Sequence, residues 1–257
     1  MVASETASAF MVRGEYETSA ERHVFGSFDT ECAAWGSTAR DAWNYVLRSP
    51  VVAGTFVWTG FDYRGEPTPY VWPSVSTFFG IYDSCGFEKE ACYLYQALWT
   101  EKPMVHLAVH WNQNVKEGTP VEAMVFSNCE EIALYLNERF LWRKPVDRIG
   151  QYTGTIPCEK GILRAEGYRG DSVVASDSKR MLGKEKHLRA EPHKNALNAD
   201  GLDAAVVDIR LVDENGTLWQ DDSSLLSFAV ENGMILGVGN GDPNCHEADI
   251  ADLRTRE

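Results

Sequence analysis

The hydrophobic pattern of the chain changes near Pro103, and this change constrains the fold more than any other feature. Before it, a predicted helix over residues 37–49 is followed almost at once by VVAGTFVW (51–58), which is continuously apolar. Such a run is typical of a parallel strand that is buried on both faces. After Pro103 come short runs such as MVHLAVHW and EIALYLN, in which apolar and polar residues alternate. These runs predict antiparallel β-sandwiches.

The first part of the chain has the order helix, buried strand, loop, helix. Thr38 or Ser37 is a candidate N-cap for the first helix, Pro50 ends it, and EKEACYLYQALWT predicts a second helix over 88–100. This order is typical of β/α folds. A closed (β/α)8 barrel needs about 250 residues, and only about 100 precede the change of pattern, so the sequence predicts a fragment of a barrel.

The predicted fold class is multidomain, α/β followed by all-β. Residues 1–103 form the barrel fragment and residues 104–180 an immunoglobulin-like sandwich. Residues 181–257 form a second such sandwich, which is predicted to be incomplete because IADLRTRE supplies no last strand.

Composition excludes several classes of function. The formal net charge of −14 argues against a basic face for nucleic acid. No run of about 18 apolar residues predicts a membrane span. The six cysteines form no CxxC pair and are predicted to be free thiols, which mildly favours a reducing compartment. GVGNGDP (237–243) predicts a glycine-rich turn of a sandwich rather than a phosphate loop, and NGT (215–217) predicts a hairpin turn.

A long aromatic loop, FVWTGFDYRGEPTPYVWPS (56–74), follows the buried strand. Trp58 is either core filler or a platform that faces a pocket. Asp62 and Glu66 are either carboxylates of that pocket or loop acids paired with Arg64. Glu5, at the end of a short predicted strand, is either a solvated acid or an active-site group, since barrel active sites lie at the carboxyl ends of strands.

Several long stretches resemble family 2 glycoside hydrolases, most closely the bacterial β-galactosidase-like members. SETASAF, AAWGSTARDAWNYV and the stretch from FVWTGFDYRGEPTPYVWPS to CYLYQALW resemble the C-terminal part of the catalytic barrel, strands seven and eight with their helices. VHLAVHWNQNVKEGTPVEAMVFSNCEEIALYLNERFL resembles the immunoglobulin-like domain that follows it, and LNADGLDAAVVDIRLVDENG the next sandwich. In the family a glycine commonly follows the asparagine of LYLN. Here Glu138 does, so a longer or different turn is expected.

The resemblance implies a retaining hydrolysis of terminal β-galactosides with two carboxylates. It assigns the nucleophile to Glu5 and substrate contacts to Trp35, Trp58 and Asp62. It also makes the polar groups of the aromatic loop, Asp62 among them, loop-holding or substrate-rim groups instead of catalytic ones. The acid/base glutamate belongs on a strand upstream of Met1, so this chain is expected to be inactive alone. The alternative is a non-catalytic carbohydrate-binding or spacer protein built of immunoglobulin-like modules.

No metal-ligand set and no cofactor are predicted for these residues, although divalent cations assist some members of the family. The expected partner is a β-galactoside or a related carbohydrate, with no nucleic acid and no membrane. The sequence leaves the sugar, the oligomeric state and the compartment open, with a bacterial cytoplasm slightly favoured.

Overall fold

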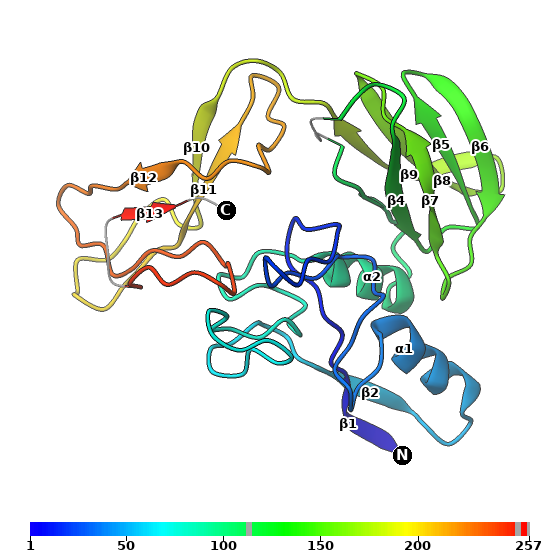
Figure 1. Cartoon of the computed structure of the whole chain (residues 1–257), viewed down its shortest axis with the longest axis horizontal. Coiled ribbons are helices and arrows are strands. Elements are labelled where there is room, and N and C mark those ends of the chain that lie inside the picture. The colour runs from blue at the N-terminus through cyan, green and yellow to red at the C-terminus, as the bar shows by residue number, and fades with distance from the viewer. Residues whose placement is uncertain (112–114, 250–252, 256–257) are drawn as a thin grey trace.

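A parallel pair of strands with a helix between them opens the chain (Figure 1). The computed structural model describes residues 1–111, 115–249 and 253–255. Strand β1 (Val2–Ala7) pairs with β2 (Gly54–Trp58), and the helix α1 (Ala39–Arg48) connects them. The side chain of Thr38 accepts a hydrogen bond from the backbone N–H of Asp41, which confirms the predicted helix and its cap.

The second helix, α2 (Glu90–Trp99), joins this first part to the sheets that follow. Its residues Leu94 and Leu98 are buried in one apolar cluster with Met124 and Phe126. Helix α2 and strand β4, which carries Met124 and Phe126, therefore share a core, and Figure 1 shows α2 beneath the sheets. The predicted helix over 88–100 is confirmed, since it begins only two residues later.

Two antiparallel sheets form a sandwich in the middle of the chain. One sheet has the order β3-β4-β7 and the other β6-β5-β8-β9. The strands are β3 (Val105–Ala108), β4 (Pro120–Ser127), β5 (Glu131–Leu136), β6 (Arg139–Pro145), β7 (Tyr152–Pro157), β8 (Ile162–Arg169) and β9 (Ser172–Arg180). Leu107 and Val121 of the first sheet are buried in the same cluster as Leu134 and Leu163 of the second. Alternate residues of each strand therefore fill the space between the sheets.

The turn between β5 and β6 corrects one expectation. Leu136 pairs with Arg139, so the hairpin has only two turn residues, Asn137 and Glu138, and their φ angles are 50° and 61°. This is the backbone of a tight type I′ turn. Glu138 adopts this positive φ because two hydrogen bonds to Ile162 fix the preceding residue, Asn137. The side-chain oxygen of Asn137 accepts from the backbone N–H of Ile162 (2.9 Å), and its backbone N–H donates to the Ile162 carbonyl (3.0 Å).

The last part of the chain contains two small antiparallel sheets (Figure 1). Strand β10 (His187–Pro192) pairs with β11 (Val207–Val212), and β12 (Leu225–Ser227) pairs with β13 (Leu253–Thr255). The predicted hairpin turn at residues 215–217 is confirmed, because Val212 bridges to Leu218 and Gly216 has a φ of 82°. Completion of a second sandwich stays a prediction.

Residues 237–249, which we call the clasp, pack on the end of the aromatic loop and on the residues that follow it. The carbonyl of Pro243 accepts hydrogen bonds from the backbone N–H groups of Val75 (2.9 Å) and Ser76 (3.2 Å). Arg13 donates to the carbonyl of Asn240 at 2.7 Å. The sandwich turn predicted over 237–243 stays a prediction, and the structure adds that Gly239 and Gly241 approach the side chains of Cys85 and Asp83.

The chain is thus mostly β-sheet with few helices. Whether its parts are a barrel fragment and immunoglobulin-like domains stays a prediction, as do the domain boundaries. Neither helix of the described residues has the length and apolar character needed to cross a bilayer.

Candidate active site

A cavity of about 740 Å³ opens beside β1, at its boundary with α1. Its lining comes from β1, the turn before α1, one side of α1 and the loop after β2: Ala3, Glu5, Thr6, Ala7, Ser8, Trp35, Gly36, Ser37, Ala42, Tyr45, Val46, Ser49, Val52, Trp58 and Glu66. Three residues predicted from the sequence, Glu5, Trp35 and Trp58, therefore lie around one cavity. Aromatic walls with a few polar groups are typical of a small-molecule site.

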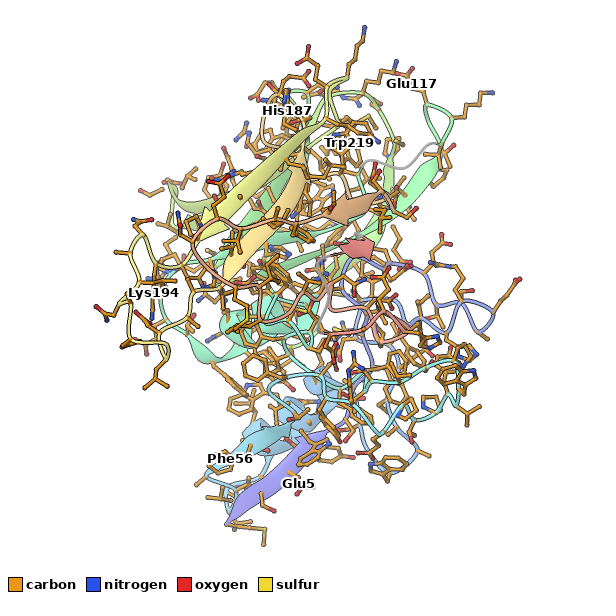
Figure 2. All side chains as sticks on the ribbon, turned by 90° about the vertical axis from the view of Figure 1, so that its left-hand side faces the viewer. Glu5, Phe56, Glu117, His187, Lys194 and Trp219 are labelled. Atoms are coloured by element: carbon orange, nitrogen blue, oxygen red, sulfur yellow. The ribbon has the colours of Figure 1, made fainter. Side chains whose placement is uncertain are left out.

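Glu5 is the exposed carboxylate of this cavity. Figure 2 shows it on β1, at the same end of the molecule as Phe56 of β2. In the described part of the chain its carboxylate has neither a hydrogen-bond nor an ion-pair partner. A carboxylate with no protein partner is available to a ligand, as a nucleophile must be.

The backbone at the end of β1 is held in an uncommon conformation. Ala7 and Ser8 have φ angles of 72° and 65°. The carbonyl of Ala7 accepts a hydrogen bond from the backbone N–H of Ser37 at 2.8 Å, and a Cβ on Gly36 would lie 2.1 Å from the same oxygen. Left-handed conformations outside glycine cost free energy and gather at functional sites. This contact holds Trp35, whose side chain is exposed, at the cavity.

Trp58, the last residue of β2, stands edge-to-face against Tyr63, with ring centroids 6.0 Å apart. The Tyr63 hydroxyl donates a hydrogen bond to Glu66, which also lines the cavity. Burial, followed by this hydrogen bond, raises the pKa of Tyr63 to about 12. Tyr63 therefore keeps its proton over the physiological range and remains a donor. From the sequence, Glu66 is either a carboxylate of the pocket or a loop acid paired with Arg64. The structure adds that Glu66 lines the cavity.

Of the two roles predicted for Asp62, loop-holding group or substrate-rim group, the structure shows contacts of the first kind. Its carboxylate is buried, accepts a hydrogen bond from the backbone N–H of Gly80 (2.7 Å) and forms an ion pair with Lys89 (2.8 Å). It is absent from the cavity lining. Its buried ion pair is a loop-holding contact, and nothing in the local sequence marked Lys89 as the partner. A contact of Asp62 with substrate stays a prediction.

Arg64 pairs with a distant acid. Its guanidinium lies 2.7 Å from the carboxylate of Asp249 in the clasp, so the structure does not show the alternative in which Asp62 and Glu66 pair with Arg64. The cavity lining consequently holds two carboxylates and no Lys, Arg or His among the described residues. Within the same described ranges, no three His, Cys, Asp or Glu side chains gather closely enough to hold a metal ion.

Comparison with known proteins identifies the class. Residues 188–256 match the model of the glycoside hydrolase family 2 C-terminal domain 5, and residues 118–175 match a domain of unknown function. A β-galactosidase of Bacteroides ovatus is 34% identical over 262 residues, covering 94% of this chain and 30% of that protein. A β-glucuronidase of Formosa agariphila is 29% identical over 171 residues, covering 64% of this chain and 17% of that protein.

Solved structures agree with these matches. A β-glycosidase from Bacteroides vulgatus superposes with a TM-score of 0.91 at 27% identity, covering 99% of this chain and 37% of that one. A family 2 member from Bacteroides cellulosilyticus gives 0.79, also at 27% identity, covering 84% and 33%. The matches place the chain among the glycoside hydrolases. Within that class it belongs to family 2, as the sequence predicted, and it spans about a third or less of the length of these relatives.

Proposed function

We propose that this chain carries the nucleophile side of a retaining glycosidase site that acts on terminal β-galactosides. The observation that carries the proposal is the position of Glu5 on a cavity whose walls include Trp35 and Trp58, with no hydrogen-bond or ion-pair partner among the described residues. Membership of family 2 supports a glycoside as substrate, and the name of the Bacteroides ovatus relative supports a galactoside. Flat aromatic faces suit the apolar faces of a sugar ring.

The same proposal gives the parts of the chain their roles. Residues 1–103 are the C-terminal part of a (β/α)8 barrel, in which β1 and β2 are neighbouring parallel strands. Residues 104–180 are an immunoglobulin-like sandwich and residues 181–257 part of a second one. The end of β1, where Glu5 lies, then belongs to the catalytic face of the barrel.

In the proposed mechanism Glu5 attacks the anomeric carbon and the glycosidic bond breaks, which leaves a glycosyl-enzyme ester. A second carboxylic acid must protonate the departing oxygen and later activate water. The resemblance to family 2 puts that acid on a barrel strand that these residues do not include, so Glu66 is not assigned this role. We therefore propose that the acid/base comes from outside these residues, and that the chain alone is inactive or nearly so. Loss of a general acid costs about 10²- to 10⁴-fold in rate.

A covalent probe tests the nucleophile without requiring the acid. The 2,4-dinitrophenyl group leaves without protonation, so 2,4-dinitrophenyl 2-deoxy-2-fluoro-β-galactoside is expected to label Glu5, as read by mass spectrometry of peptides. Glu5→Gln should abolish the label, and Glu17→Gln, an exposed acid outside the cavity, should leave it unchanged. Labelling of another carboxylate would refute the assignment of Glu5.

Turnover of nitrophenyl β-galactoside tests the second part of the proposal. The chain alone is expected to show no turnover. A hydrolysis rate that Glu5→Gln removes would contradict the proposed inactivity while supporting the nucleophile.

A further inference from the structure

We propose that Glu66 is a sugar-binding carboxylate that makes the cavity select neutral glycosides over uronic acids. The inference rests on the proposed function, since it assumes that the sugar enters the cavity at Glu5. It goes further by assigning a role to a residue of the aromatic loop and by choosing between two substrate classes found among the relatives, galactosides and glucuronides.

The contacts that position Glu66 begin at the backbone of Tyr63. The N–H of Tyr63 donates to the hydroxyl of Thr77 at 3.0 Å, and the carbonyl of Tyr63 accepts from the backbone N–H of Thr77 at 2.9 Å. Thr77 is fully buried, so this anchor is rigid. The ring of Tyr63 is then fixed against Trp58, and its hydroxyl is aimed at Glu66. A binding group held in place by such neighbours loses little conformational entropy when a ligand arrives.

Glu66 retains room for a ligand. One carboxylate oxygen, Oε2, accepts the hydrogen bond from Tyr63, whereas Oε1 receives none from the protein residues that the structure describes. An ionised carboxylate offers about four acceptor positions, so most of its capacity is free. Sugar hydroxyls are donors, and a hydrogen bond to a charged acceptor is stronger than one between neutral groups. Glu66 therefore suits a neutral sugar that presents hydroxyl groups to this wall.

The charge of the cavity gives the selectivity. Glu5 and Glu66 both line it, and its described lining contains no basic side chain. The nearest basic residue in the loop sequence, Arg64, is paired with Asp249 instead. A uronic acid would bring a third negative charge, and none of the described residues that line the cavity is a cation that could pair with it. At the separations within one cavity, such repulsion amounts to about one kcal/mol in water and more where water is excluded, or roughly a fivefold to tenfold loss of affinity.

The test is a titration of the 257-residue chain with methyl β-D-galactoside and methyl β-D-glucuronide at low ionic strength. The readout is the indole N–H resonance of Trp58, assigned with Trp58→Phe, because Trp58 lies on the cavity wall. The wild-type chain is expected to bind the galactoside, and the glucuronide about tenfold more weakly. Glu66→Gln, which preserves shape, should weaken galactoside binding about tenfold and reduce the discrimination between the two sugars.

Two further variants sharpen the experiment. Tyr63→Phe removes the hydroxyl that orients Glu66, and should weaken galactoside binding by a smaller factor than Glu66→Gln. Glu17→Gln removes an exposed acid outside the cavity and should change neither affinity, which excludes an effect of net charge alone. Circular dichroism checks that each variant is folded.

The outcomes separate this inference from the proposed function. If Glu5 is labelled by the fluorinated probe but Glu66→Gln leaves both affinities unchanged, the catalytic proposal stands and the role of Glu66 is wrong. Equal affinity for the two sugars in the wild-type chain also overturns the inference. If neither sugar shifts the Trp58 resonance and Glu5 is not labelled, both proposals fail together.

Discussion

Lys89 is the buried cation that holds the aromatic loop, and its replacement by methionine tests the structural role now given to Asp62. The Lys89 side chain is 0% exposed and that of Asp62 5%. The Lys89 ammonium also donates to the carbonyl of Phe78 at 3.0 Å. Methionine has a similar length and no charge, so Lys89→Met leaves the Asp62 carboxylate buried without its cation. Among the described residues, only the N–H of Gly80 and the hydroxyl of Thr77 would still donate to it.

The expected cost follows from this burial. Removing one partner of a buried ion pair destabilises a protein by about 3–5 kcal/mol, because the other charge is left uncompensated. The two remaining donors to Asp62 place the expected loss for Lys89→Met near the lower end, about 3 kcal/mol. The double variant Asp62→Asn with Lys89→Met removes the unpaired charge. It should recover about half of that loss, because neutral replacements of buried pairs are well tolerated.

Urea unfolding, followed by tryptophan fluorescence, measures these changes in the free energy of unfolding. Arg64→Ala is the matched control, since it removes an ion pair whose partners are both more than half exposed, and it should cost less than about 1 kcal/mol. If Lys89→Met costs no more than Arg64→Ala, or if the double variant is no more stable than Lys89→Met, the pair does not hold the loop.

Three other substitutions have definite expected outcomes. Gly36→Ala places a Cβ 2.1 Å from the carbonyl oxygen of Ala7. The free energy of unfolding should therefore fall by about 1–3 kcal/mol, which thermal melts would show as a lower melting temperature. Burial acts to raise the pKa of Glu90, but the charge and hydrogen bond of His106 outweigh it and lower the pKa. The resulting stabilisation is present above the usual glutamate value of 4.5 and is lost as the pH falls through the lowered pKa. Wild type should therefore lose more stability than Glu90→Gln in thermal melts as the pH falls below 4.5. Glu138→Gly should stabilise the chain by about 0.5–1 kcal/mol in urea, because glycine adopts the positive φ without strain. A destabilised Glu138→Gly would mean that the glutamate side chain contributes more than its backbone costs.

The sequence predicted the elements whose signals are local. Thr38 caps α1 because a cap needs only its own hydroxyl and the next turn of backbone. Trp58 ends β2 because an apolar run ends there, and the resemblance placed Glu5 on the wall of what proves to be a cavity. In each case the decisive residues are neighbours in the chain or part of a recognisable motif.

The features that escaped prediction depend on partners far away in the chain. Asp62 and Glu66 are similar acids of the same loop, and only the folded chain shows that one is buried against Lys89 while the other lines the cavity. The two-residue turn at Glu138 depends likewise on the neighbouring strand, which overrides the local preference against positive φ. The residue type predicts the charge of a side chain, whereas its tertiary contacts determine whether that charge is buried or faces the cavity.

The clasp has a consequence for the order in which the molecule assembles during synthesis. Ser74 donates a hydrogen bond to Asn244, 170 residues further along the chain, and Arg13 donates to Asn240 across 227 residues. At about 5–20 residues per second, the ribosome needs roughly 10 to 30 s to supply Asn244 after Ser74. During that interval the aromatic loop lacks its last hydrogen-bond partners. The loop that carries Trp58 and Glu66 therefore gains these contacts only after about 170 further residues have been translated.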